Sequence, residues 1–157
     1  MKFPKVSGSN LLRQKLTLPE DLQGSLNLVF VPFWQWQQME VNSWLPLAAE
    51  LEKTTAGLHA YELPTIQSRS PLSRWFINEG MRAGIPNQKT REHTITLYID
   101  KGAFRRALEM NDEDHIYVLL LDRTGSVIWR GRGSYSAENA ASLERVLQNF
   151  SQIPAAL

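Results

Sequence analysis

The last third of the chain constrains the fold most, because a strand pair and a helix follow one another there with only short connecting segments. Ile116–Leu121 is a continuous apolar run, which is typical of a strand buried on both faces. Asp122-Arg123-Thr124-Gly125 has the composition of a tight turn, and Val127–Arg130 predicts the returning strand. Ser136 is a suitable N-cap for a final helix with an apolar side. This block predicts a β-hairpin covered by a terminal helix.

The preceding residues predict alternating strands and helices. Residues 1–24 are polar and suggest an extended lead-in, whereas Leu26–Phe33 is a near-continuous apolar run that predicts a central strand. The further predicted elements are a helix at 42–54, a strand at 58–65, a helix from Ser70 to Gly84, a strand at 94–98 and a short helix that Asp100 caps. The order predicts one α/β domain over residues 1–157, with a mixed sheet covered on both faces.

Composition excludes several classes of function. The sequence contains no cysteine, so disulfides, cysteine metal sites and thiol catalysis are excluded. A net charge of +1 provides no overall field for nucleic acid, and we expect no nucleic-acid partner. The N-terminus lacks the apolar region of a secretory signal, and the apolar runs are too short to span a bilayer. We therefore expect a soluble, cytoplasmic protein without membrane insertion.

The predicted order, together with local motifs, resembles the thioredoxin-like superfamily. Thioredoxins have a strand ending in Phe-Trp, then Cys-x-x-Cys at a helix start, and a proline five residues after the second cysteine. Phe33-Trp34 and Pro46 stand at matching positions, which places Gln38 and Val41 at the two cysteine positions. At the other end, Leu119–Leu121, Gly125, Gly133 and Ser136 are in step with the family pattern. The resemblance implies a thioredoxin-like three-layer sandwich.

The resemblance also implies that the redox site is missing. The family's cis-proline, which faces the cysteines, corresponds approximately to Tyr117, preceded by Ile116. A cis bond before a residue other than proline costs about 2.5–4 kcal/mol, so we expect a trans peptide here. A carboxamide such as that of Gln38 is a poor nucleophile. We therefore expect neither catalytic residues nor a cofactor, and the protein is predicted to be redox-inactive.

Two narrower resemblances suggest what the protein does instead. The lead-in, with Pro4–Gly8 and Leu18–Gly24, is similar to the N-terminal extension of peroxiredoxin-like and TlpA-like proteins. The stretch from Tyr98 to Leu143 resembles the ATP10 family of mitochondrial ATP-synthase assembly factors, which is also thioredoxin-like. This second resemblance implies a protein-binding, assembly or chaperone-like module.

We predict a contact surface at the former active site, formed by Trp36, Gln38, Met39, Val41 and Tyr117. An exposed Trp beside Met is typical of a protein-binding surface. A protein or peptide partner, or a second copy in a homodimer, would occupy it. A neighbouring loop that covers Trp36 would leave no such surface. A separate alternative is that the domain is a structural piece of a larger complex and binds no ligand.

The alternative is a metal-dependent or cofactor-free enzyme that uses the loop of Asp112, Asp114 and His115 together with Glu92-His93. Acidic groups beside an imidazole suit a hard cation or a proton-transfer histidine. A solvated acidic loop explains the same residues. The enzyme hypothesis requires these groups to converge in one pocket.

Overall fold

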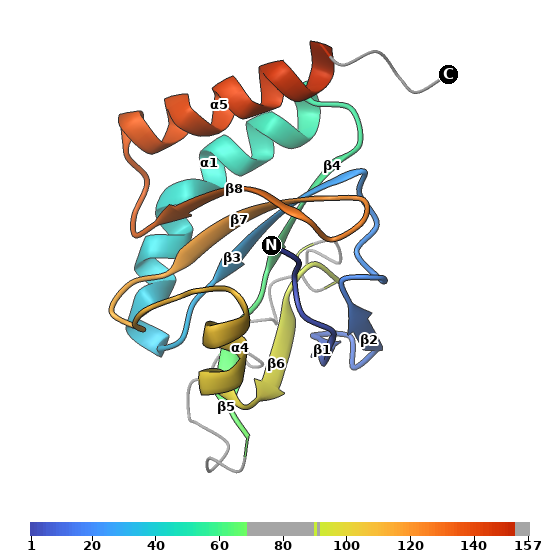
Figure 1. The fold of residues 1–157 in the computed structure, drawn as a ribbon, viewed down its shortest axis with the longest axis vertical. Coiled ribbons are helices and arrows are strands. Elements are labelled where there is room, and N and C mark those ends of the chain that lie inside the picture. Colours follow the sequence, from blue (N-terminus) through green and yellow to red (C-terminus); the bar gives the residue numbers. More distant parts are fainter. Residues whose placement is uncertain (69–89, 91, 153–157) are drawn as a thin grey trace.

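A computed structural model describes residues 1–68, 90 and 92–152 of the chain. Its central sheet contains four of the predicted strands: β3 (Leu26–Val31), β4 (Leu58–Glu62), β7 (Tyr117–Asp122) and β8 (Val127–Arg132). The strand order is β4-β3-β7-β8 (Figure 1). β4 is parallel to β3, whereas β7 is antiparallel to both β3 and β8. The predicted mixed sheet and its closing hairpin are confirmed.

A second four-stranded sheet lies beside the first, where one central sheet was expected. It contains β1 (Val6–Asn10), β2 (Lys15–Leu18), β5 (Thr65–Gln67) and β6 (Ile95–Ile99), in the order β2-β1-β6-β5. The predicted strand at 58–65 is therefore divided, since β4 ends at Glu62 and the chain enters the other sheet at Thr65. The predicted lead-in is extended, but it also forms an antiparallel hairpin that pairs with β6.

Helices cover the central sheet. A short 3-10 helix, η1 (Gln35–Gln37), precedes α1 (Gln38–Thr54), which begins four residues before its predicted start. α1 and α5 (Ala137–Gln152) lie on one face of the sheet, and α4 (Lys101–Ala107) lies on the other (Figure 1). The caps agree with prediction, because side-chain oxygens of Asp100 and Ser136 accept the backbone N–H groups of the residues three positions later. The predicted helix from Ser70 to Gly84 lies outside the described residues.

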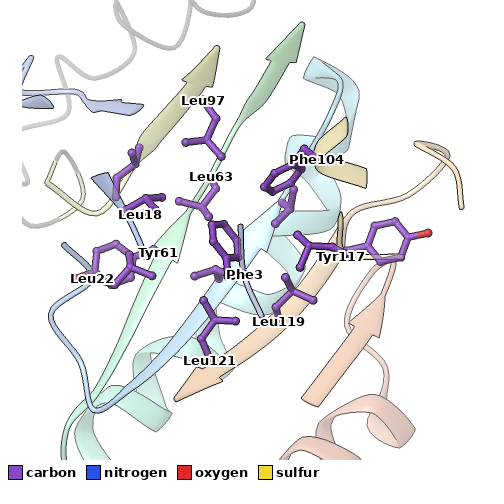
Figure 2. Packing of buried hydrophobic residues seen from close by; sticks show 14 of the residues in the cluster. Phe3, Leu18, Leu22, Tyr61, Leu63, Leu97, Phe104, Tyr117, Leu119 and Leu121 are labelled. Atoms are coloured by element: carbon purple, nitrogen blue, oxygen red, sulfur yellow. The ribbon is translucent and has the colours of Figure 1, made fainter. Parts of the chain in front are cut away.

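Alternation along the strands divides the core in two. Ile116, just before β7, and Val118 and Leu120 on it face α1 and α5, where they pack with Trp44 and Leu143. Tyr117, Leu119 and Leu121 face the opposite side and pack with the second sheet, α4 and Phe3 (Figure 2). Both faces of β3 and β7 are thus buried, which explains their uninterrupted apolar sequences. The arrangement is the predicted three-layer sandwich of the α/β class.

No helix within the described part of the chain has the length and apolar character needed to cross a membrane.

Candidate functional site

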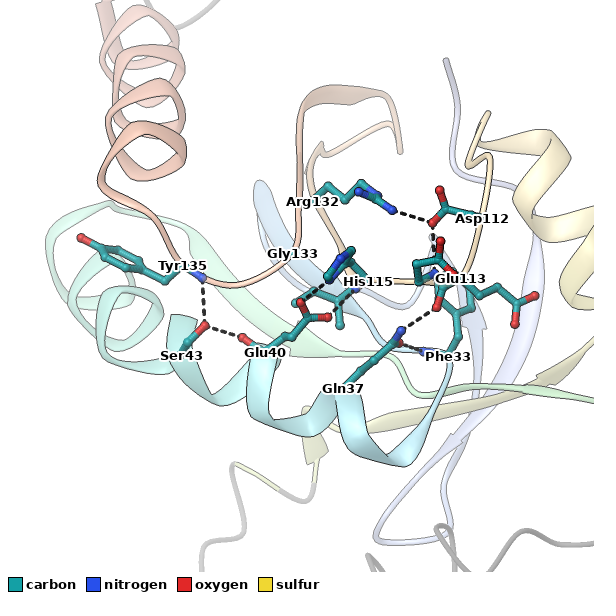
Figure 3. A network of polar contacts seen from close by, with 12 residues as sticks. Phe33, Gln37, Glu40, Ser43, Asp112, Glu113, His115, Arg132, Gly133 and Tyr135 are labelled. Carbon is teal, nitrogen blue, oxygen red and sulfur yellow. Dashed lines mark hydrogen bonds and ion pairs between the residues drawn. The ribbon is translucent and has the colours of Figure 1, made fainter.

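The turn between β3 and α1 is fixed by buried polar groups. The N–H of Phe33 donates to Gln37 Oε1 at 2.7 Å, and the carbonyl of Phe33 accepts from Lys101 Nζ at 3.0 Å. The Gln37 amide, which has no exposed surface, also donates to the carbonyl of Glu113 at 2.6 Å (Figure 3). Side chains therefore satisfy both backbone polar groups of Phe33, and the turn has a defined geometry.

Lys101 brings a positive charge under this turn. Its side chain is buried, and Nζ lies 3.3 Å from Glu113 Oε1 and 3.9 Å from the centre of the Trp34 ring. Arg105 Nη1 lies 3.4 Å from the other carboxylate oxygen of Glu113. A cation over the face of an indole is attracted by its quadrupole. Lys101 thus connects Glu113 to the indole of Trp34 and holds one face of that ring.

Three large side chains at the start of α1 face solvent. The exposed fractions are 50% for Trp34, 54% for Trp36 and 77% for Met39. We call these three residues the helix-start surface. Trp36 also contacts the His115 ring edge-to-face, with the ring centres 6.3 Å apart. Exposed tryptophan and methionine at one place are uncommon on surfaces that contact only water and are enriched where proteins bind.

A buried carboxylate lies behind this surface. Glu40, in the first turn of α1, is 6% exposed. Its Oε2 lies 2.7 Å from His115 Nδ1, and its Oε1 accepts the N–H of Ile116 at 3.1 Å (Figure 3). A carboxylate only accepts hydrogen bonds, so this contact matches the tautomer of His115 that carries a proton on Nδ1. The pair connects α1 to the residue before β7.

The predicted contact residues separate in the structure. Gln38 is partly exposed and donates to Asn42 at 3.1 Å, and Trp36 and Met39 lie in the helix-start surface. Val41 and Tyr117 are corrections, because they are buried at 0% and 4% exposure. Val41 is the fourth residue of α1, and its side chain packs in the core beneath the helix.

Tyr117 is buried because of strand alternation. Its ring packs edge-to-face on Phe33 at 6.2 Å on the sheet face away from α1, and the Arg130 guanidinium lies 5.2 Å from its centre. His115, two residues earlier, faces the helix start instead. The Ile116–Tyr117 bond is trans, as expected.

The groups of the enzyme hypothesis do not converge. Arg132 donates to Asp112 at 2.8 Å, and this hydrogen bond, helped by the N–H of Asp114, holds the pKa of the Asp112 carboxyl below its usual value. His115 is engaged with Glu40. His93 lies elsewhere, stacked on Tyr61 with ring centres 4.4 Å apart.

The groups of the enzyme hypothesis line two different cavities. Glu92 and His93 line a cavity beside Tyr61, whereas Asp112 lines another with Tyr117 and Arg132. In the part of the chain that the structure describes, no three histidine or acidic side chains form a metal-binding group.

Sequence reasoning missed Gln37, Glu40 and Lys101. Glu40 had a signal, because Val41 and Trp44 mark the buried face of the helix and Glu40 directly adjoins it. Lys101 and Gln37 had none, since their partners come from distant parts of the chain.

Solved structures with the same fold include several thioredoxin-like proteins. A putative electron transfer protein from Aquifex aeolicus VF5 superposes with a TM-score of 0.65 at 10% identity, covering 100% of this chain and 98% of the other. A putative thiol:disulfide interchange protein DsbE from Chlorobium tepidum gives 0.59 at 16% identity, covering 94% of both chains. At these identities the likeness establishes the thioredoxin-like fold alone.

The sequence also matches the family described as "ATP10 protein" over residues 1–150. The match extends far beyond the stretch from Tyr98 to Leu143 that carries the sequence resemblance. A comparison with curated protein sequences finds no match.

Proposed function

The chain belongs to the ATP10 protein family, and on that premise we propose that it is a redox-inactive assembly factor that binds a protein partner during ATP-synthase assembly. The family membership supports an assembly role. The exposure of the helix-start surface supports this surface as the place where the partner binds. No cofactor enters the proposal.

The absence of thiols supports the redox-inactive part of the proposal. The chain contains no cysteine, and Gln38 and Val41 stand at the positions that thioredoxins use for theirs. Val41 is fully buried, and the Gln38 carboxamide forms a hydrogen bond to Asn42. Neither side chain has the ionisable, accessible sulfur that disulfide exchange requires.

The observation that carries the binding proposal is the exposure of Trp34, Trp36 and Met39 on a fixed turn. Binding costs less free energy when the contacting side chains are already ordered. Lys101 and Gln37 order the backbone on which the two indoles lie. Tryptophan is the residue type that most often dominates a binding interface, so we expect Trp36 to be a principal contact.

The test compares Trp36→Ala with Phe150→Ala, a control at an exposed aromatic near the far end of α5. Each tagged variant is expressed in place of the native protein in the native cell. The captured proteins and the assembled ATP synthase are then measured on native gels. We expect Trp36→Ala to lose captured ATP-synthase subunits and assembled enzyme, with a binding loss of about 2 kcal/mol or more, near thirtyfold. Phe150→Ala should retain both.

Other results would point elsewhere. Equal capture of ATP-synthase subunits by both variants would refute the helix-start surface as the binding site. Light scattering that shows a dimer converted to a monomer by Trp36→Ala would mean that a second copy occupies this surface. The enzyme hypothesis has no support among the described residues, since its groups line separate cavities; one equivalent of metal in the purified protein would revive it.

A further inference from the structure

The outer edge of β8 is a second place where a partner fits, and it is distinct from the helix-start surface. β8 is the last strand of the order β4-β3-β7-β8 (Figure 1). Among the described residues, strand pairing along this outer edge comes from the N-terminal residues, which reach no further than Val127. Beyond them, the Asn139 side chain donates a long hydrogen bond of 3.5 Å to the carbonyl of Arg132, which keeps a second lone pair. An unpaired strand edge presents backbone donors and acceptors to a further strand.

The register shows which backbone groups point outward. The N–H of Gly133 donates to the carbonyl of Ile116, so the groups of Gly133 point toward β7. Paired antiparallel residues alternate in direction. Gly131 and Trp129, which pair with Val118 and Leu120, therefore also point toward β7. The backbone groups of Arg130 and Arg132 point away from the sheet.

The chain itself already uses the first part of this edge. The N–H of Val127 donates to the carbonyl of Met1 at 2.9 Å, and the N–H of Phe3 donates to the carbonyl of Gly125 at 2.8 Å. Lys2 and Ser126 form an antiparallel bridge between these bonds. The edge therefore has the geometry to accept an antiparallel strand, and the pairing stops where the outward groups of Arg130 and Arg132 begin.

The side chains beside this edge are basic. On β8, Arg130 and Arg132 pair with Leu119 and Tyr117 of β7, so they share the sheet face away from α1. They line a hollow of about 510 Å³ together with Asn111, Asp112, Tyr117 and Gly131. Arg130 donates to the carbonyls of Leu108 and Glu109, and Arg132 donates to Asp112. Each guanidinium has five N–H donors, so both retain donors for a carboxylate.

We propose that the outer edge of β8, from Ile128 to Arg132, binds an extended segment of a protein partner with acidic side chains at alternate positions. The segment would add an antiparallel strand, with backbone bonds to Arg130 and Arg132 and carboxylates over the hollow between their side chains. A second copy of β8 fits less well, because antiparallel pairing of two such edges places arginines near arginines, and like charges opposite one another destabilise a strand pair.

The test uses peptides of about ten residues and the whole chain labelled with ¹⁵N. The first peptide alternates Val with Glu, the second alternates Val with Lys, and the third has the acidic sequence with proline at its centre. Chemical shifts and amide hydrogen exchange are followed. We expect the acidic peptide to slow exchange at Arg130 and Arg132, while Trp129 and Gly131 change little because they already bond to β7. The lysine and proline peptides should leave all four amides unchanged.

Two variants give opposite predictions. Arg132→Gln removes one cation and should weaken the acidic peptide about two- to fivefold, as expected for an exposed ion pair. Asp112→Asn removes the competing carboxylate and should strengthen binding by a similar factor. The proposal is overturned if the acidic peptide protects neither amide at millimolar concentration, or if both charged peptides protect them equally. Inorganic phosphate that reproduces the shifts, with no amide protection by the peptide, would mean an anion site without strand addition.

Discussion

The buried Glu40 carboxylate offers a stability test whose magnitude follows from its two contacts. Glu40→Leu removes both carboxylate oxygens and leaves the N–H of Ile116, a residue with no exposed surface, without its acceptor. An unsatisfied buried N–H costs about 1–3 kcal/mol. The lost bond to His115 adds about 1 kcal/mol, because the imidazole is 45% exposed and water weakens the pair. We expect a total loss of about 2–4 kcal/mol.

Two matched variants separate the contributions. Glu40→Gln retains an oxygen for Ile116 and should cost about 1 kcal/mol. His115→Ala retains the Ile116 bond and should cost a similar amount. In the double variant Glu40→Leu with His115→Ala, the shared bond is removed once, so the cost should be less than the sum.

The assay is urea unfolding followed by circular dichroism, with thermal unfolding as a second measure. For a chain of this length, 1 kcal/mol corresponds to roughly 2–4 °C, so Glu40→Leu should lower the melting temperature by roughly 4–16 °C. Equal destabilisation by Glu40→Leu and Glu40→Gln would refute the reasoning, since only the leucine variant removes the acceptor of the Ile116 N–H.

Three further predictions concern the turn at β7 and the turn before α1. Gly125→Ala should destabilise the protein by about 1–2 kcal/mol in urea unfolding, because φ is +84° there; an unchanged midpoint would contradict this. Although burial raises the pKa of Asp122, hydrogen bonds, led by the Thr124 side chain, lower it on balance. The stability that the ionised Asp122 carboxylate contributes is therefore present above the unfolded pKa of about 3.9 and is lost as pH falls through the lower folded pKa. Asp122→Asn should therefore lose less stability than wild type across that interval in acid titration. Lys101→Met should lower the free energy of unfolding by about 1–3 kcal/mol, because the Phe33 carbonyl loses its donor, and should increase hydrogen exchange in that turn; an unchanged exchange rate would contradict the assigned contact.

The elements predicted correctly are those whose sequence pattern matches their burial. β3 and β7 read as uninterrupted apolar runs because both of their faces are covered. The β1–β2 hairpin was missed because its first strand is mostly polar and contains glycine. Gly8 is nonetheless buried, and a Cβ there would lie 2.7 Å from the Leu97 side chain and 2.8 Å from the carbonyl of Thr96. Close approach to β6 explains that glycine, but only the tertiary structure reveals it.

The exposure of the predicted contact residues was foreseen only in part. Trp36 and Met39 are exposed as predicted, because a helix start at a sheet edge leaves its first residues uncovered. Tyr117 was wrong because it lies within β7 and faces away from α1, whereas His115 precedes the strand and is not bound by its alternation. His115 has the position that Tyr117 was given.

The polar groups beneath the helix-start surface are better explained by the backbone positions that they fix than by the folding stability that they add. A buried ion pair frequently contributes no more than apolar residues of the same volume, so Lys101 with Glu113 gives no evident advantage in folding energy. Hydrogen bonds differ from apolar contacts in having direction. Lys101, Gln37 and Glu40 together fix the backbone at Phe33 and Ile116, on either side of Trp36. A surface that only faced water would not need this definition, whereas one that presents indoles to a partner gains affinity from it.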